Sequence, residues 1–335
     1  MSGLDLTYSE EQELFRKSVR GFAADRVPID RLAEIADGDQ GWDPALWKEA
    51  VGLGLAGVGV AEAHGGAGMG FVEEAIAAEE LGRAVFPGPW LGSVILAQPA
   101  LAEAPDLLAA VVSGERVATV AGLGRYAVDL PAADLLVIHK DGNLVTVDRD
   151  DVAWRSFSTV DGTRRLGQVT EEITGGSLLA RGDRASAIVE ATISRLRAAL
   201  AAEAVGVSSG VLDQAVAYAG ERQQFATPIG KYQAVSHQLA DTFMDVELAR
   251  SLALWAAVAI DSGDPEAGMA ASTAASFAAD AAVRTAERAI QVHGGIGFTW
   301  EQGLHRPYKR ALWIRAFLGG DLRDSVAARL IDRAQ

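Results

Sequence analysis

The chain has 335 residues, of which 49% are hydrophobic and 22% charged, and this composition predicts a globular protein with one large domain or two to three smaller ones. The formal net charge of −15 argues against a nucleic-acid or anionic-membrane partner, because either would need a broad basic face, and leaves open a small anionic ligand held by a few arginines. The lack of cysteine excludes disulfides, thiolate nucleophiles and the usual structural zinc sites, and we predict no metal site.

The first segment, residues 1–114, is predicted to be a helical domain. Its first residues lack the apolar core of a signal peptide and no run in the sequence is apolar enough to span a membrane, so we expect a cytoplasmic protein. Apolar residues at helical spacing predict helices over 9–27, 43–51, 72–84, 91–101 and 106–113. Gly52 to Gly57 has the spacing of dinucleotide-binding glycines, but a helix rather than a strand precedes it, which favours a tight helix-to-loop path.

The second segment, residues 115–183, loses the helical periodicity. β-Branched residues and turns replace it, which predicts a small all-β domain of five or six short strands, with strands over 117–120, 135–139 and 144–147. Asp141-Gly142-Asn143, between the last two of these strands, is a strong hairpin signal.

The third segment, residues 184–335, is helical again and rich in alanine. Long periodic runs over 188–221, 233–262 and 266–291 predict a closely packed antiparallel bundle, because small residues let helices approach one another. The predicted fold class is therefore mainly α with a small β domain.

A corner between the first two long helices carries the clearest chemical signal. Pro228 and Gly230 break the helical pattern there, and the corner offers Arg222, polar side chains and backbone amides in one place. This set suits a phosphate or pyrophosphate. From these residues alone, an ordinary helical hairpin with a solvated arginine stays the alternative.

A second motif, from Gln291 to Thr299, lies at the C-terminal end of the third long helix and contains paired glycines that let a ligand or another chain approach the backbone. Together with the run from Arg222 to Phe225, with Gln233 and with the three-part order, it closely resembles the acyl-CoA dehydrogenase family over essentially the whole chain. The resemblance implies an N-terminal helical domain, a middle β domain and a C-terminal four-helix bundle.

The resemblance also implies the chemistry: FAD accepts a hydride from the β carbon of an acyl-CoA while a carboxylate removes the α proton. The residues it implies at the pyrophosphate and adenosine end of FAD, across a subunit interface, are Arg222, Gln224, Phe225, Gln233, Gln291, Gly294 and Gly295. Arg197 matches a family arginine beside the acyl pocket, with a surface or inter-helix salt bridge as the equal alternative.

Two departures from the family pattern change the interpretation. The usual base, a glutamate before a glycine, corresponds to Leu318, and the base of a variant branch corresponds to Leu196, so neither position can accept a proton. Asp321, Glu301 and Glu203 lie nearby in sequence, but nothing promotes them to a base, and we expect Glu203 to pair within the bundle.

The second departure is in the sheet, where the chain runs from 117–123 through 126–130 directly into 133–138 and omits the strands that surround the flavin ring in the family. We therefore expect this domain not to hold a flavin ring of its own.

Both departures lead to one hypothesis: a shortened subunit of an α2β2 acyl-CoA dehydrogenase that shares FAD with a longer partner and acts on a bulky acyl-CoA, such as one with a steroid side chain. The alternatives are a self-sufficient homomer with an unrecognised base, a non-catalytic scaffold subunit, and a flavin monooxygenase or hydratase-like relative on the same fold.

Overall fold

The computed structural model describes residues 6–171, 175–319 and 322–333. Contacts within the chain define two compact units, each built from separate stretches of sequence. The bundle unit comprises Met1–Ile29, Ala75–Phe86 and Arg197–Gln335, and the sheet unit comprises Asp30–Glu74 and Pro87–Leu196. These boundaries differ from the predicted ones at 114 and 183, because one long helix, α7 (Gly182–Glu221), contributes to both units. The three-part division stays a prediction.

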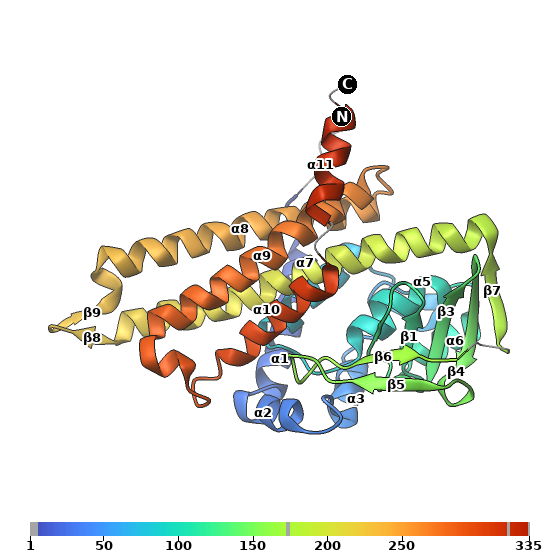
Figure 1. Cartoon of the computed structure of the whole chain (residues 1–335), viewed down its shortest axis with the longest axis horizontal. Coiled ribbons are helices and arrows are strands. Elements are labelled where there is room, and N and C mark those ends of the chain that lie inside the picture. The colour runs from blue at the N-terminus through green and yellow to red at the C-terminus, as the bar shows by residue number, and fades with distance from the viewer. Residues whose placement is uncertain (1–5, 172–174, 320–321, 334–335) are drawn as a thin grey trace. The chain divides into compact units, whose positions relative to one another are not determined.

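The bundle unit is a set of long helices, as the alanine-rich periodic runs predicted. Figure 1 shows α8 and α9 side by side, with α10 beside α9. Alanine fills the buried face of α9, and its small side chain allows this close packing. The helices of this unit are α1 (Glu10–Arg26), the end of α4 (Phe71–Arg83), the second part of α7, α8 (Gln233–Asp261), α9 (Ala267–His293), α10 (His305–Leu318) and α11 (Leu322–Arg333).

Two glycines bring α4 and α7 into backbone contact. A Cβ atom at Gly206 would overlap the carbonyl oxygen of Glu79, and one at Gly82 would overlap that of Glu203. A larger side chain at either position would therefore force the two helices apart.

The same part of α4 carries two buried carboxylates that are bound by arginines. Arg16 Nη1 of α1 lies 3.0 Å from Glu79 Oε2, and Arg20 Nε donates to Glu80 Oε2 at 2.7 Å. Burial pushes the pKa of Glu80 up, but the hydrogen bond from Arg20 and the charges of the nearby arginines outweigh it and hold that pKa below its ordinary value.

The sheet unit begins with short helices. The predicted helices near 43–51 and 106–113 are confirmed, and the path from Gly52 to Gly57 follows a helix through turns, as expected. Residues 91–101 form a buried π-helical stretch that continues as a short α-helix, rather than one regular helix. The helices are α2 (Ile29–Asp37), α3 (Pro44–Gly52), η1 (Glu62–His64), the start of α4, η2 (Leu91–Ala97), α5 (Gln98–Leu101), α6 (Pro105–Val112), η3 (Arg149–Asp151) and the start of α7.

Seven strands of the described chain form the two sheets of this unit, whereas the sequence predicted five or six. One sheet has the order β1-β3-β4-β7 and the other β2-β6-β5. Strands β1 and β3 are parallel, whereas β3 and β4 form the predicted hairpin, with Asp141 and Gly142 at positive φ as a two-residue turn requires. The strands are β1 (Ala118–Ala121), β2 (Ala127–Val128), β3 (Leu135–Lys140), β4 (Asn143–Asp148), β5 (Trp154–Phe157), β6 (Leu166–Val169) and β7 (Ser177–Arg181).

No helix in the described part of the chain has both the length and the apolar character needed to cross a membrane.

Candidate functional site

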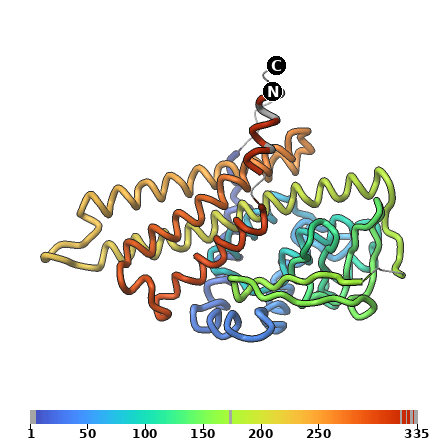
Figure 2. The backbone as a smooth tube through the Cα atoms, viewed as in Figure 1, coloured from blue at the N-terminus to red at the C-terminus, as the bar shows by residue number. Residues whose placement is uncertain are grey.

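The corner after α7 is a small, well-defined hairpin. Strands β8 (Gln223–Gln224) and β9 (Thr227–Pro228) pair, and the chain reverses between them before η4 (Ile229–Lys231) and α8 (Figures 1 and 2). The two turn residues, Phe225 and Ala226, both have positive φ, at 52° and 58°. Left-handed conformations cost non-glycine residues on the order of 1–3 kcal/mol each, and the turn presents Phe225 with 92% of its surface exposed. An aromatic ring held in solvent by a strained turn is a feature expected of a contact surface.

The polar side chains of this corner are available to a ligand. Arg222 is exposed, and its guanidinium makes neither an ion pair nor a hydrogen bond with the described part of the chain. Gln224 is also exposed, and among the described residues its side-chain amide donates only to the neighbouring carbonyl of Gln223, at 2.8 Å. Exposed Gln233 begins α8, whose N-terminus has no side-chain cap. An uncapped helix N-terminus and a free guanidinium each favour an anion.

The glycine motif forms a tight turn directly after α9, within η5 (Gly294–Phe298). Gly294 has φ 64° and ψ −138°, a conformation that is open in practice only to glycine. A Cβ atom at Gly294 or Gly295 would have no neighbour within 4 Å, so the backbone there is open to a ligand. Gly297 is different, because a Cβ atom would lie 2.6 Å from the carbonyl oxygen of Ile290. Gln291, in the last turn of α9, is exposed.

The structure brings these two motifs to one end of the bundle. The rings of Tyr218 and His293 are stacked, with centroids 4.3 Å apart, and the amide of Arg222 donates to the carbonyl of Tyr218 at 2.8 Å. Ile229 of the corner packs against a core cluster that includes Ile290 of α9. The sequence reasoning missed Tyr218 and His293, because an aromatic residue and a histidine in long helices give no signal of a mutual contact.

Arg197 lies apart from this corner. It lies in α7 24 residues before the end of the helix at Glu221, a length of about 36 Å at 1.5 Å per residue, and Arg222 follows that end. Its Nη1 donates to the hydroxyl of Ser272 on α9 at 3.0 Å, and burial lowers the pKa of Arg197. Arg197 forms no ion pair with the described residues, so the inter-helix salt bridge that was the alternative for Arg197 is not found among them.

Neither of the two positions that we predict to correspond to the family's base carries an ionisable group. Leu196 lies half-buried in α7, and Leu318 is the half-buried last residue of α10. Glu203 forms a buried ion pair with Arg310 of α10, which confirms its predicted pairing within the bundle. Glu301 is exposed, and Asp321 lies outside the described residues.

The residues at the corner fit the pyrophosphate end of FAD. Arg222 supplies an unused positive charge, Gly294 and Gly295 leave room for backbone approach, and Phe225 offers an exposed ring. A guanidinium and accessible backbone amides can donate to a pyrophosphate, and an aromatic ring can pack against an adenosine.

Comparison with known proteins gives matches over most of the chain. Residues 9–105 match the N-terminal domain of acyl-CoA dehydrogenases, and residues 186–331 match the C-terminal domain of the same family. Acyl-CoA dehydrogenase IpdE2 of Mycolicibacterium smegmatis is 32% identical over 93% of this chain and 95% of its own length. Acyl-CoA dehydrogenase FadE34 of Mycobacterium tuberculosis is 35% identical over 95% of this chain but only 47% of its own length, so this chain spans about half of FadE34.

Solved structures share the fold. The Tcur3481–Tcur3483 steroid acyl-CoA dehydrogenase matches with a TM-score of 0.87 and 30% identity, covering 97% of this chain and 99% of the matched one. The ChsE4–ChsE5 complex from Mycobacterium tuberculosis matches with a TM-score of 0.86 and 25% identity, covering 98% of this chain and 99% of the matched one. Two matched family domains, and a relative 32% identical over nearly the whole length, show that the chain belongs to the acyl-CoA dehydrogenase family.

Proposed function

We propose that this chain is one subunit of a heteromeric FAD-dependent acyl-CoA dehydrogenase, which contacts FAD bound mainly by a longer partner and supplies no catalytic base. The observation that carries the proposal is a contrast within the bundle unit. The free Arg222 and the open Gly294–Gly295 turn lie at one end of the bundle, whereas a leucine, Leu318, occupies the position that the sequence predicts for the base.

The corner would act on the phosphate and adenosine end of the cofactor. Arg222 would donate charge-assisted hydrogen bonds to the pyrophosphate, and Phe225 would pack against the adenosine. The remaining contacts would come from the side chains of Gln224, Gln233 and Gln291 and from the backbone of Gly294 and Gly295. When FAD is bound, it supplies the hydride acceptor.

The pairing of the buried carboxylates supports the lack of a base. A general base needs a carboxylate free to take a proton in reach of the substrate. Each buried carboxylate of the described chain already has an ion-pair or hydrogen-bond partner; these are Glu74, Glu79, Glu80, Asp129, Asp161 and Glu203. The α proton would therefore be removed by a residue of the partner.

Three similarities support a longer partner and a bulky substrate. Two of the matched structures carry paired protein names, Tcur3481–Tcur3483 and ChsE4–ChsE5, and the first is a steroid acyl-CoA dehydrogenase. FadE34 is long enough to contain a region like this chain and a second one of similar size. We therefore propose an α2β2 heterotetramer in the cytoplasm, acting on an acyl-CoA with a bulky, steroid-type side chain. Arg197, half-buried with a single hydroxyl partner, would face the acyl group.

The test is expression of the chain alone and together with a longer homologue encoded beside it. The flavin absorbance per chain and the α,β-dehydrogenation of a steroid side-chain acyl-CoA are measured with an artificial electron acceptor. We expect both flavin and activity only in the co-expressed complex. A yellow, active homomer would instead establish a self-sufficient enzyme, and a complex whose flavin content is unchanged by Arg222→Gln would favour a scaffold role.

A further inference from the structure

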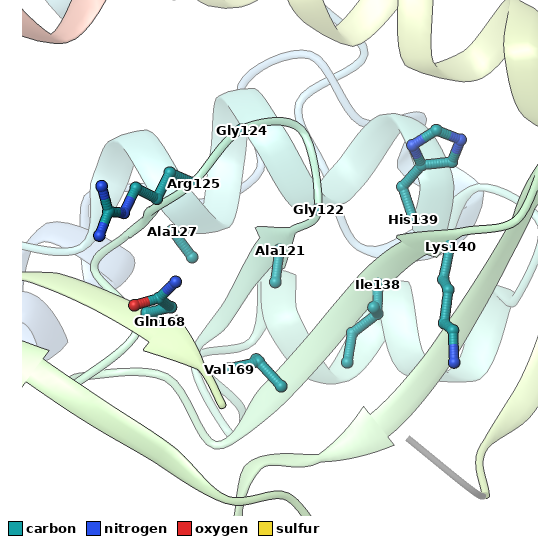
Figure 3. Close-up of a pocket in the computed structure, with 10 residues that line it drawn as sticks. All are labelled: Ala121, Gly122, Gly124, Arg125, Ala127, Ile138, His139, Lys140, Gln168 and Val169. Atoms are coloured by element: carbon teal, nitrogen blue, oxygen red, sulfur yellow. The ribbon is translucent and has the colours of Figure 1, made fainter. Parts of the chain in front are cut away.

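The sheet unit contains a cavity of about 290 Å³ that the proposed function does not use. It lies where β1 and β3 end, and because these strands are parallel, their carboxyl ends meet at the same edge. Apolar side chains from β1, β2, β3 and β6 form its floor: Ala121, Ala127, Ile138 and Val169 (Figure 3).

The rim of this cavity consists of hydrogen-bond donors. Arg125, His139, Lys140 and Gln168 line it, and no acidic side chain does so among the described residues. The Arg125 guanidinium has no ion pair or hydrogen bond within the described ranges, although it lies over the ring of Tyr126. Lys140 is partly neutralised, since its Nζ lies 4.0 Å from Asp141 Oδ2.

The orientation of Gln168 is fixed by a neighbouring arginine. Its Oε1 accepts from Arg155 Nε at 3.2 Å and from Arg155 Nη2 at 2.8 Å, and a guanidinium can only donate. The amide nitrogen of Gln168 is therefore turned away from Arg155, and Figure 3 shows Gln168 and Arg125 at the same side of the cavity. The Gln168 amide and the Arg125 guanidinium are thus two donors of the rim with no acceptor of the described chain bound to either.

The loop that arches over the cavity adds backbone donors. The amides of residues 122–125 make no hydrogen bond within the described part of the chain. Gly122 has φ 87°, and a side chain there would overlap the carbonyl oxygen of His139, so the loop lies directly against β3. Successive free amides in a turn form a concave surface that favours an anion.

From these donors and this floor we propose that the cavity is a binding site for a small molecule with a flat apolar body and one oxyanion, a phosphate or a carboxylate. The oxyanion lies between Arg125 and Gln168, and the apolar body rests on the floor. In a chain with a net charge of −15, a rim without acidic side chains is a local exception that favours anions. The site lies within the sheet unit and does not depend on the flavin proposal.

Calorimetric titration of the full-length protein tests the site with three probes of similar shape: phenyl phosphate, benzoate and neutral benzyl alcohol. We expect at least one of the two anions to bind at least about ten-fold more tightly than benzyl alcohol, because one hydrogen bond to a charged group strengthens binding by about that factor. The two anions distinguish a phosphate from a carboxylate site. Equal binding of all three probes, or none, would overturn the proposal.

Variants locate the binding. Arg125→Gln is expected to weaken anion binding about ten-fold. Gln168→Glu keeps an acceptor for Arg155 and nearly the same shape, but it places a negative charge at the rim and should abolish anion binding. Arg181→Gln, on β7 and outside the cavity, is the control for net charge. If Arg181→Gln weakened binding as much as Arg125→Gln, the anionic probes would be attracted by charge alone rather than bound at the cavity, and the proposed site would be wrong.

Discussion

Gly295 and Gly297 belong to the same turn but should respond in opposite ways to alanine. At Gly295 the added methyl group meets no atom within 4 Å, so Gly295→Ala should change the free energy of unfolding by no more than about 0.5 kcal/mol. The methyl group would, however, occupy the space through which FAD approaches the backbone. Loss of one hydrogen bond to a charged acceptor weakens binding by about 1.5–3 kcal/mol, which corresponds to about a ten- to hundred-fold higher Kd for FAD.

Gly297→Ala is the matched comparison. Its methyl group would lie 2.6 Å from the Ile290 carbonyl oxygen and 3.0 Å from the Cβ of His293, so overpacking should destabilise the fold by about 1–3 kcal/mol. Urea unfolding of the flavin-free complex measures stability, and quenching of flavin fluorescence measures the Kd. A Gly295→Ala complex that binds FAD as the wild type does would refute the assignment of this turn to the cofactor.

Three further predictions concern charged residues. Arg222→Gln should raise the Kd for FAD about ten-fold or more with an unchanged urea midpoint, whereas Arg181→Gln should leave the Kd unchanged. Glu203→Leu removes the carboxylate that forms the ion pair with the fully buried Arg310 and should cost about 3–5 kcal/mol in urea unfolding. Adding Arg310→Met should recover most of that loss, and a double variant no more stable than the single one would contradict this explanation. Because the pKa of Glu80 is lowered in the folded state, its charge stabilises the fold at pH values above the ordinary glutamate pKa of about 4.3. This stabilisation is lost as the pH falls through the lowered pKa of the folded state. Urea midpoints from pH 3 to 7 should therefore fall less steeply with acid in Glu80→Gln than in the wild type, although that variant is less stable at pH 7; parallel curves would exclude Glu80 as a source of the pH dependence.

Much of the fold could be predicted because its signals are local. Ser9 forms a capping box with Gln12 at the start of α1, and Asp141-Gly142 specifies the β3–β4 turn. The π-helical stretch over 91–97 could not be predicted, since every residue in it is buried and no polar face marks its period. The two-residue strand β2 likewise depends on its partner β6 rather than on its own sequence.

The candidate site divides in the same way. The chemistry that we propose for Arg222 and for the paired glycines rests on short motifs in the sequence. Their position at one end of the bundle depends on the contact between Tyr218 and His293, which are 75 positions apart in the printed sequence. The partner of Glu203 could not be named for the same reason, because Arg310 lies 107 residues further along the chain. Tertiary packing, which no local pattern encodes, decides both contacts.

The flavin content of the co-purified complex tests the central claim most directly. Native mass spectrometry, which counts FAD molecules per assembly, should find an α2β2 complex with one FAD for each pair of unlike chains. In the proposed assembly the longer subunit would hold the flavin ring, and this chain would contribute only the Arg222 corner and the Gly294–Gly295 turn. One FAD for every chain, or full flavin occupancy in an assembly of this chain alone, would contradict the account.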